Sequence, residues 1–240
     1  MTLPQINIQR YPIHLACSKR DVEFRPFTVG EEKILLSIIE SKGEGEEFEI
    51  KDFVTAFTQI LTECTFNKVD ISKLPTFDVE HLFIRIREIS VGTDVKISAT
   101  CAHCEEKNIV NIKLSDIEDP KPLDDHNRTI MLDPSQNIGI KMKYPEFSTL
   151  SNLKEISDTL QIIIDSVDCV FQGENVTYLK DEPKEAVEEW FSTLTKEHVN
   201  KIKHFFETTP RCRLPISFKC SNCGEMNEGV SVEGLMNFFS

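Results

Sequence analysis

The chain lacks the segments that would send a protein into or across a membrane. Its first ten residues contain no apolar core of signal-peptide length, and its longest apolar stretch, Ile34–Ile39, is far shorter than the roughly 20 residues that cross a bilayer. We therefore expect a protein that stays in the cytosol where it is made. Because disulfides are rare in that reducing compartment, the eight cysteines are expected to be free thiols or metal ligands.

Catalytic signatures are also absent from the sequence. It contains no Gly-x-x-x-x-Gly-Lys-Ser/Thr phosphate loop, no Gly-x-Gly-x-x-Gly, no His-Glu-x-x-His and no Gly-x-Ser-x-Gly. The six histidines are scattered, and 40 acidic residues are too many for any two to stand out as an acid–base pair. The sequence therefore makes no case for an enzyme or for a small-molecule substrate.

Basic residues are in short supply, with 27 lysines and arginines against 40 acidic residues and a net charge of −13. Binding to a phosphate backbone needs a positive field, so nucleic acid is an unexpected partner. The one local run of lysines, within Lys196–Lys203, falls on the polar face of a helical pattern. A solvated helix face explains that run better than a binding surface does.

Two Cys-x-x-Cys pairs, Cys101/Cys104 and Cys220/Cys223, are the most informative motif that the chain does contain. Each pair lies at a bend between two segments of strand-like alternation. Two residues between cysteines let one tight turn direct both sulfurs at a single ion, and two such turns complete a tetrahedron. Only the second turn carries a glycine, Gly224, directly after its last cysteine.

This pattern predicts a four-thiolate zinc ribbon that is split by a long insertion. A site closed by four sulfurs leaves no position for water or substrate, so the zinc is expected to hold structure. An iron–sulfur centre is the less favoured alternative, and redox-active or unliganded thiols are a further one.

Apolar residues at helical spacing predict three helices before the first cysteine pair, after an irregular stretch through Arg20. The first begins near Val29. The second presents one apolar face, made of Phe53, Val54, Phe57, Ile60 and Leu61. The third is expected to be capped by Thr76 and to end at Gly92.

The predicted fold class is therefore α+β, with an N-terminal helical unit in residues 1–92. The split zinc ribbon takes residues 93–115 and 212–240, and a mostly helical insertion takes residues 116–211. The insertion and the chain end are expected to contain a Pro- and Asp-rich loop at 116–125, hairpins at 128–142 and 167–179, a long helix at about 145–166, helices around 187–194 and from a Thr195 cap to 206, and a short helix at 232–239.

Two blocks of sequence carry a family resemblance. Residues 24–36, Phe-Arg-Pro-Phe-Thr-Val-Gly-Glu-Glu-Lys-Ile-Leu-Leu, and residues 70–92, followed by Cys101-x-x-Cys104, resemble the baseplate hub and hub-assembly proteins of T4-like contractile-tailed bacteriophages. In its order of elements the resemblance covers roughly residues 20–235.

The resemblance implies a non-enzymatic protein that forms part of the central hub of the tail baseplate or helps to build it. Its partners would be other tail proteins, met in the host cytoplasm during assembly, and it would either stay in the virion or leave it.

Two phenylalanine pairs, Phe24/Phe27 and Phe238/Phe239, are candidate contact surfaces for such partners, although ordinary core filling explains them equally well. Two other functions stay open. A nucleic-acid-binding or transcription-associated zinc-ribbon protein would concentrate its basic side chains on one face. A redox or iron–sulfur protein would absorb visible light.

Overall fold

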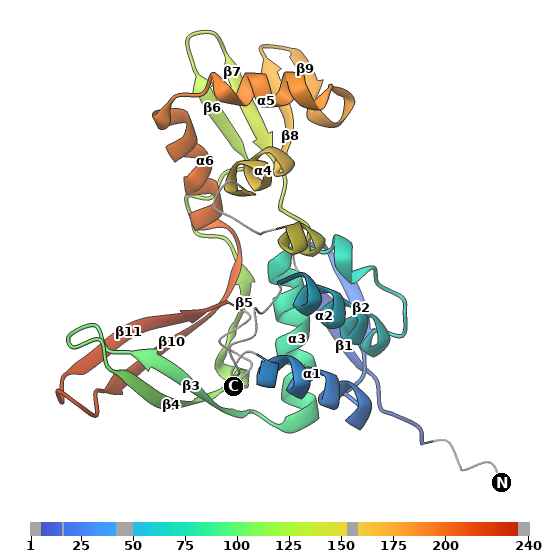
Figure 1. Ribbon diagram of the computed structural model, residues 1–240, viewed down its shortest axis with the longest axis vertical. Coiled ribbons are helices and arrows are strands. Elements are labelled where there is room, and N and C mark those ends of the chain that lie inside the picture. The colour runs from blue at the N-terminus through green and yellow to red at the C-terminus, as the bar shows by residue number, and fades with distance from the viewer. Residues whose placement is uncertain (1–5, 16, 42–49, 153–157, 235–240) are drawn as a thin grey trace. The chain divides into compact units, whose positions relative to one another are not determined.

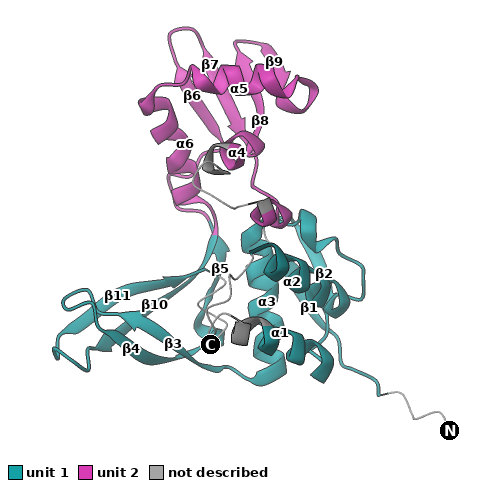
Figure 2. Cartoon of the chain, in the orientation of Figure 1, with its two compact units in different colours: residues 1–121, 211–240 teal, residues 122–210 magenta. Residues whose placement is uncertain are grey.

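The computed structural model describes residues 6–15, 17–41, 50–152 and 158–234. The chain forms two compact units, which are coloured separately in Figure 2. The first unit contains residues 1–121 and 211–240, and the second contains residues 122–210. Both units combine helices with antiparallel sheets, so the predicted α+β class is confirmed (Figure 1).

The first unit begins with an antiparallel hairpin of β1 (Tyr11–Leu15) and β2 (Arg20–Phe24). Alternate side chains of both strands are buried, Leu15 and Phe24 most deeply. The prediction of an irregular stretch through Arg20 is therefore wrong, and the N-terminal part of the chain contains a hairpin in addition to its predicted helices. The alternation is present in the sequence, but it is short and Pro12 makes it resemble a loop.

Three helices follow, as the apolar spacing predicts: α1 (Val29–Ser41), α2 (Ile50–Cys64) and α3 (Thr76–Val91). A short 3₁₀ turn, Ile71–Lys73, precedes α3. The N-cap of α3 is Pro75 and it makes no side-chain cap bond, so the prediction of a Thr76 cap is wrong. The predicted end at Gly92 is confirmed, because this glycine lies just past the helix with a φ of 100°.

Polar side chains of α3 anchor the strands around it. Asp78 accepts a hydrogen bond from the backbone N–H of Ser18, in the turn between β1 and β2, at 3.0 Å. His81 and Arg85 contact the carboxylate of Asp119 at 2.9 and 3.0 Å. These contacts make α3 the central element of the first unit.

The two cysteine turns lie on separate hairpins of the first unit, as predicted. The strands are β3 (Asp94–Thr100) with β4 (Lys107–Lys113), and β10 (Arg211–Lys219) with β11 (Met226–Glu233). The facing apolar residues of the two hairpins, together with Ile84 of α3, form one buried cluster.

The expected loop at 116–125 is partly structured. After the 3₁₀ turn Leu114–Asp116, strand β5 (Glu118–Lys121) pairs antiparallel with β10. The three strands form one sheet in the order β11-β10-β5, and Lys121, at the end of β5, is the last residue of the first unit before the chain enters the second. Strand β11 continues to Glu233, where a helix was expected, and the rest of that predicted helix lies outside the described residues. The three-part division of the chain stays a prediction.

The second unit is a four-stranded antiparallel sheet, order β6-β7-β8-β9, with helices packed on it. Its elements are β6 (Thr129–Asp133), β7 (Ile138–Met142), β8 (Val167–Gln172), β9 (Asn175–Tyr178), α4 (Asp158–Asp165), α5 (Lys184–Ser192), α6 (Lys196–Thr208) and the 3₁₀ turns Phe147–Asn152 and Leu179–Asp181.

Both predicted hairpins and the last two helices are confirmed. Thr195 is the N-cap of α6, and its side chain accepts a hydrogen bond from the backbone N–H of His198. Instead of one long helix at 145–166, the described residues form a 3₁₀ turn and the shorter α4. The prediction was a mostly helical insertion, whereas this unit is built on a four-stranded sheet.

Candidate metal centre

The two cysteine turns bring four sulfur atoms together. The Sγ atoms of Cys101, Cys104, Cys220 and Cys223 all lie within 4.8 Å of one another. Across the two turns, Cys101 lies 3.8 Å from Cys223 and Cys104 lies 3.6 Å from Cys220, sulfur to sulfur. Residues far apart in the sequence thus converge on one point, as the spacing predicts.

The two turns have the same backbone geometry. The N–H of each first cysteine, Cys101 or Cys220, donates to the carbonyl five residues later at 2.9 Å. The residue directly after each second cysteine has a positive φ, 60° at Glu105 and 76° at Gly224. The first turn therefore takes the left-handed position without a glycine, so its lack of one does not distinguish it from the second.

Sequence reasoning missed two buried residues of this site, Asn108 and Asn227. Their side-chain amides donate to sulfurs of the cluster, Asn108 to Cys220 at 3.5 Å and Asn227 to Cys101 at 3.4 Å. A signal was present, because residues 101–108 and 220–227 share the pattern Cys-x-x-Cys-x-Glu-x-Asn.

Hydrogen bonds at the cluster favour the thiolate form of Cys220. The backbone N–H of Cys223 is the largest cause, the N–H of Asn222 and the side chain of Asn108 add to it, and the pKa of Cys220 falls to about 6. Elsewhere burial acts in the opposite direction and raises the pKa of Cys64 to about 12. The four thiols are not shifted alike: at Cys223 a hydrogen bond from the backbone N–H of Glu225 favours the thiolate, but burial and the hydrogen bonds with the other three sulfurs outweigh it and raise the pKa to about 12. Thiolate is the form that binds metal, so the hydrogen bonds at Cys220 favour ligation.

The donor set fits a single tetrahedral ion. Zinc–sulfur bonds of about 2.3 Å place the sulfurs of a regular tetrahedron about 3.8 Å apart. The two distances across the turns, 3.6 and 3.8 Å, match that spacing. Four soft thiolates suit zinc or iron rather than a hard cation. The cluster could therefore hold a metal ion.

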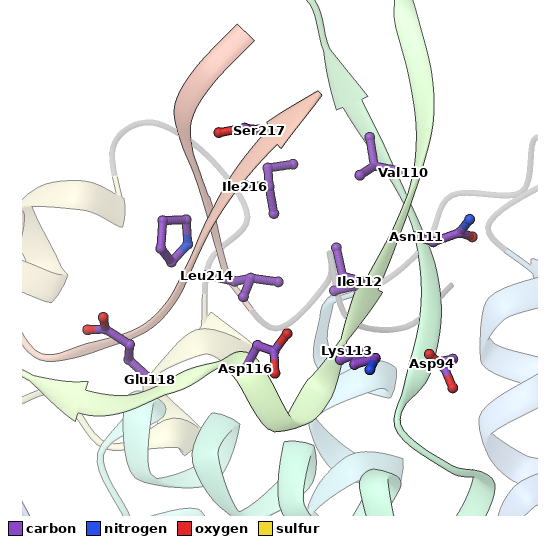
Figure 3. Close-up of a pocket in the computed structure, with 11 residues that line it drawn as sticks. Asp94, Val110, Asn111, Ile112, Lys113, Asp116, Glu118, Leu214, Ile216 and Ser217 are labelled. Carbon is purple, nitrogen blue, oxygen red and sulfur yellow. The ribbon is translucent and has the colours of Figure 1, made fainter. Parts of the chain in front are cut away.

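A groove of about 600 Å³ lies between strands β4 and β10 (Figure 3). Val110 and Ile112 face Leu214 and Ile216 across it, and polar side chains such as Asp116 line its rim. Three of the four apolar residues are less than 10% exposed and belong to the buried cluster of the unit. The groove is thus the seam between the two hairpins whose turns carry the cysteines.

The phenylalanines chosen as contact candidates lie in different surroundings. Phe24 is 3% exposed and stacks on Tyr11, with ring centroids 5.8 Å apart. Phe27 is half-buried and packs against Phe83 at 6.0 Å. Phe238 and Phe239 lie outside the described residues. A contact role for these residues stays a prediction.

The fold and the site together define an α+β protein in which two hairpins share a cluster of four thiols able to hold one metal ion. No helix in the described part of the chain has the length and apolar character needed to cross a bilayer.

The chain belongs to the T4 bacteriophage base plate protein family, whose model matches residues 8–240. It is thus a structural protein of the phage baseplate, and the resemblance noted in the sequence is confirmed. Comparison with curated proteins and with solved structures found no match.

Proposed function

We propose that this chain acts in the central hub of the tail baseplate, as a hub component or as a factor that assembles the hub. It does so without catalysis, through contacts with other tail proteins, in the host cytoplasm during assembly and in the virion if it remains there. The observation that carries the proposal is the family match over residues 8–240.

Exposed apolar side chains on the first unit support a contact role. Val29 and Leu36 of α1 are 70% and 50% exposed, and Val91 at the end of α3 is 53% exposed. The N–H of Phe27 donates to Ser90 Oγ at 2.8 Å, which holds the start of α1 against the end of α3. A contiguous apolar patch marks a surface that a partner covers, and Val29 and Val91 lie within two residues of the two ends of this hydrogen bond.

We further propose that the four cysteines bind zinc and that the two hairpins form a split zinc ribbon. The bound ion would cross-link the turns and so hold the two ends of the first unit together. A single iron in the same four sulfurs is the alternative, and its visible absorption distinguishes it from colourless zinc.

Native mass spectrometry of the tagged chain, purified gently from phage-infected cells, tests both proposals. One zinc per chain with tail proteins attached is the expected result. Tail proteins without a metal would refute the zinc site alone. Nucleic acid in place of tail proteins would refute the hub role.

A matched pair of variants sharpens the metal measurement. Cys220→Ser removes one of the four ligands and should abolish stoichiometric zinc and lower the melting temperature. Cys17→Ser removes a half-buried thiol outside the cluster and should leave the zinc content unchanged. Equal zinc in both variants would show that the ion is bound elsewhere.

A further inference from the structure

Asn108 and Asn227 hold equivalent places in the two cysteine turns, each four residues after the second cysteine of its own turn. Both are buried, at 5% and 4% exposure. Each side chain reaches across to the other turn. Asn108, on β4, bonds the turn between β10 and β11, and Asn227, on β11, bonds the turn between β3 and β4.

The hydrogen bonds of Asn108 use its whole amide group. The Nδ2 group donates to the carbonyl of Glu106 in its own turn at 3.0 Å and to the sulfur of Cys220 at 3.5 Å. The Oδ1 atom accepts from the N–H of Ser221 at 2.8 Å and from its hydroxyl at 2.9 Å. Two donors and two lone pairs are thus all satisfied, which no other side chain of this size can do.

Asn227 repeats this arrangement in the opposite direction. Its Nδ2 group donates to the sulfur of Cys101 at 3.4 Å and to the carbonyl of Glu225 at 3.4 Å. Its Oδ1 atom accepts from the N–H of Ala102 at 2.9 Å. Each hairpin therefore supplies one buried amide to the turn of the other, and each first cysteine receives one asparagine hydrogen bond on its sulfur. The exposed Asn222 adds a weaker contact, donating to the sulfur of Cys104 at 3.7 Å.

We infer that Asn108 and Asn227 are positioning residues of the metal centre. They hold the two turns in register, and each lowers the electron density on the sulfur of one cysteine, Cys220 or Cys101. This inference rests on the proposed metal centre. A hydrogen bond to a thiolate draws electron density from the sulfur, and such partners of ligands usually change metal affinity 10- to 100-fold when they are lost. The oxygen side of each amide ties the turns together whether or not an ion is present.

Cobalt(II) is a suitable probe, because its thiolate charge-transfer band reports the electron density on the sulfurs. We expect Asn108→Asp and Asn227→Asp, which replace the donor to sulfur by a charged acceptor, to bind cobalt roughly 10- to 100-fold more weakly than the parent and to shift the band to lower energy. Asn111→Asp is the matched control, because Asn111 is exposed on the same strand as Asn108. Its affinity and band should equal those of the parent.

The inference is wrong if Asn108→Asp, folded by circular dichroism, binds cobalt with the parent's affinity and band position. If that variant does not fold, Asn108→Ser keeps a small polar group and is used in the same titration. A parent chain that binds neither cobalt nor zinc would refute the metal centre itself, which is a different failure.

Hydrogen exchange on the metal-free chain tests the pairing independently of any ion. Asn108→Leu should raise the exchange rate of the Ser221 amide, and Asn227→Leu should raise the exchange rate of the Ala102 amide. In both variants the faster-exchanging amide lies in the turn opposite to the substituted residue. Unchanged exchange at both amides would overturn the inference even if the metal centre holds.

Discussion

The buried ion pair of Arg25 and Glu31 leads to a quantitative prediction for the first unit: Glu31→Gln should lower the free energy of unfolding by about 3 kcal/mol. Two guanidinium nitrogens of Arg25 donate to the two carboxylate oxygens at 2.8 and 2.6 Å. The N–H and hydroxyl of Thr28 donate to the same carboxylate at 2.6 and 2.9 Å. This carboxylate therefore caps the start of α1 and also neutralises Arg25.

The size of the effect follows from burial. The side chains of Arg25 and Glu31 are 14% and 4% exposed, and removing one partner of a buried pair costs about 3–5 kcal/mol. We take the lower end because Arg25 also donates to the carbonyl of Pro26 at 3.0 Å and keeps some contact with water. Glutamine preserves the shape but has one acceptor oxygen for four donors. Against a total stability of about 5–15 kcal/mol, the loss is easily measured.

Urea unfolding followed by circular dichroism is the assay. Glu32→Gln, in the same turn but exposed, is the matched control and should change stability by less than about 0.5 kcal/mol. Arg25→Met combined with Glu31→Gln should cost less than the sum of the two single changes, because the pair is removed together. If Glu31→Gln and Glu32→Gln unfold at the same urea concentration, the assignment of the pair as a stabilising contact is refuted.

The same ion pair makes the free energy of unfolding depend on pH in the acidic range. Burial opposes ionisation of Glu31, but the hydrogen bonds from Arg25 and Thr28 outweigh it and hold its pKa below the ordinary value of 4.5. A lowered pKa in the folded state means that the contribution is present above pH 4.5 and is lost as the pH falls through the folded-state pKa. Stability in that acidic range should therefore depend less on pH in Glu31→Gln than in the parent.

Three further predictions concern single positions. Gly139→Ala should destabilise the second unit by about 1–3 kcal/mol, because the added methyl would lie 2.8 Å from the carbonyl of Ile130 and closer still to the ring of Phe171. Thr195→Ala should cost about 1 kcal/mol by removing the cap of α6. Burial raises the pKa of Glu80 to about 7 from 4.5, so stability should fall as pH rises between those values, and Glu80→Gln should remove that slope.

Each of the three has its own comparison, and thermal unfolding measures the first two. Gly30→Ala, where the nearest atom lies 3.7 Å from the added methyl, should be tolerated, and an equal loss there would contradict the steric argument. Thr177→Ala, at an exposed strand position, should cost less than Thr195→Ala. For Glu80, the folded chain holds a proton between pH 5 and pH 7 that the unfolded chain has lost, so unfolding in this range should release up to about one proton. A parent whose urea midpoint is constant between pH 5 and pH 7 would contradict the raised pKa.

The elements that the sequence predicted well are those specified by nearby residues. The cysteine turns are set by their spacing and by the alternating strands on either side. The Thr195 cap and the helix end at Gly92 depend on contacts within one turn of chain. Strand β5 was missed because Glu118–Lys121 is polar and contains a proline, and it becomes a strand only by pairing with β10, which comes far later in the chain.

The two asparagines of the metal centre were missed for a similar reason. Their role depends on which residues of the other hairpin lie opposite, and one hairpin's sequence does not contain that information. The shared eight-residue pattern of the turns was the available clue, since Asn108 and Asn227 end it in both copies. Comparing the two motifs with each other, beyond their cysteines, would have identified them.

The pairing of β5 with β10 makes the second unit removable in principle. Lys121, the last residue before that unit, lies opposite Arg211, the first residue after it, in an antiparallel ladder. The chain therefore leaves the first unit and returns to it at a single rung, where a hairpin loop of about two residues could join the strands. Replacing residues 122–210 by such a loop should therefore leave the pairing of β5 with β10, and the cysteine hairpins beyond it, unchanged.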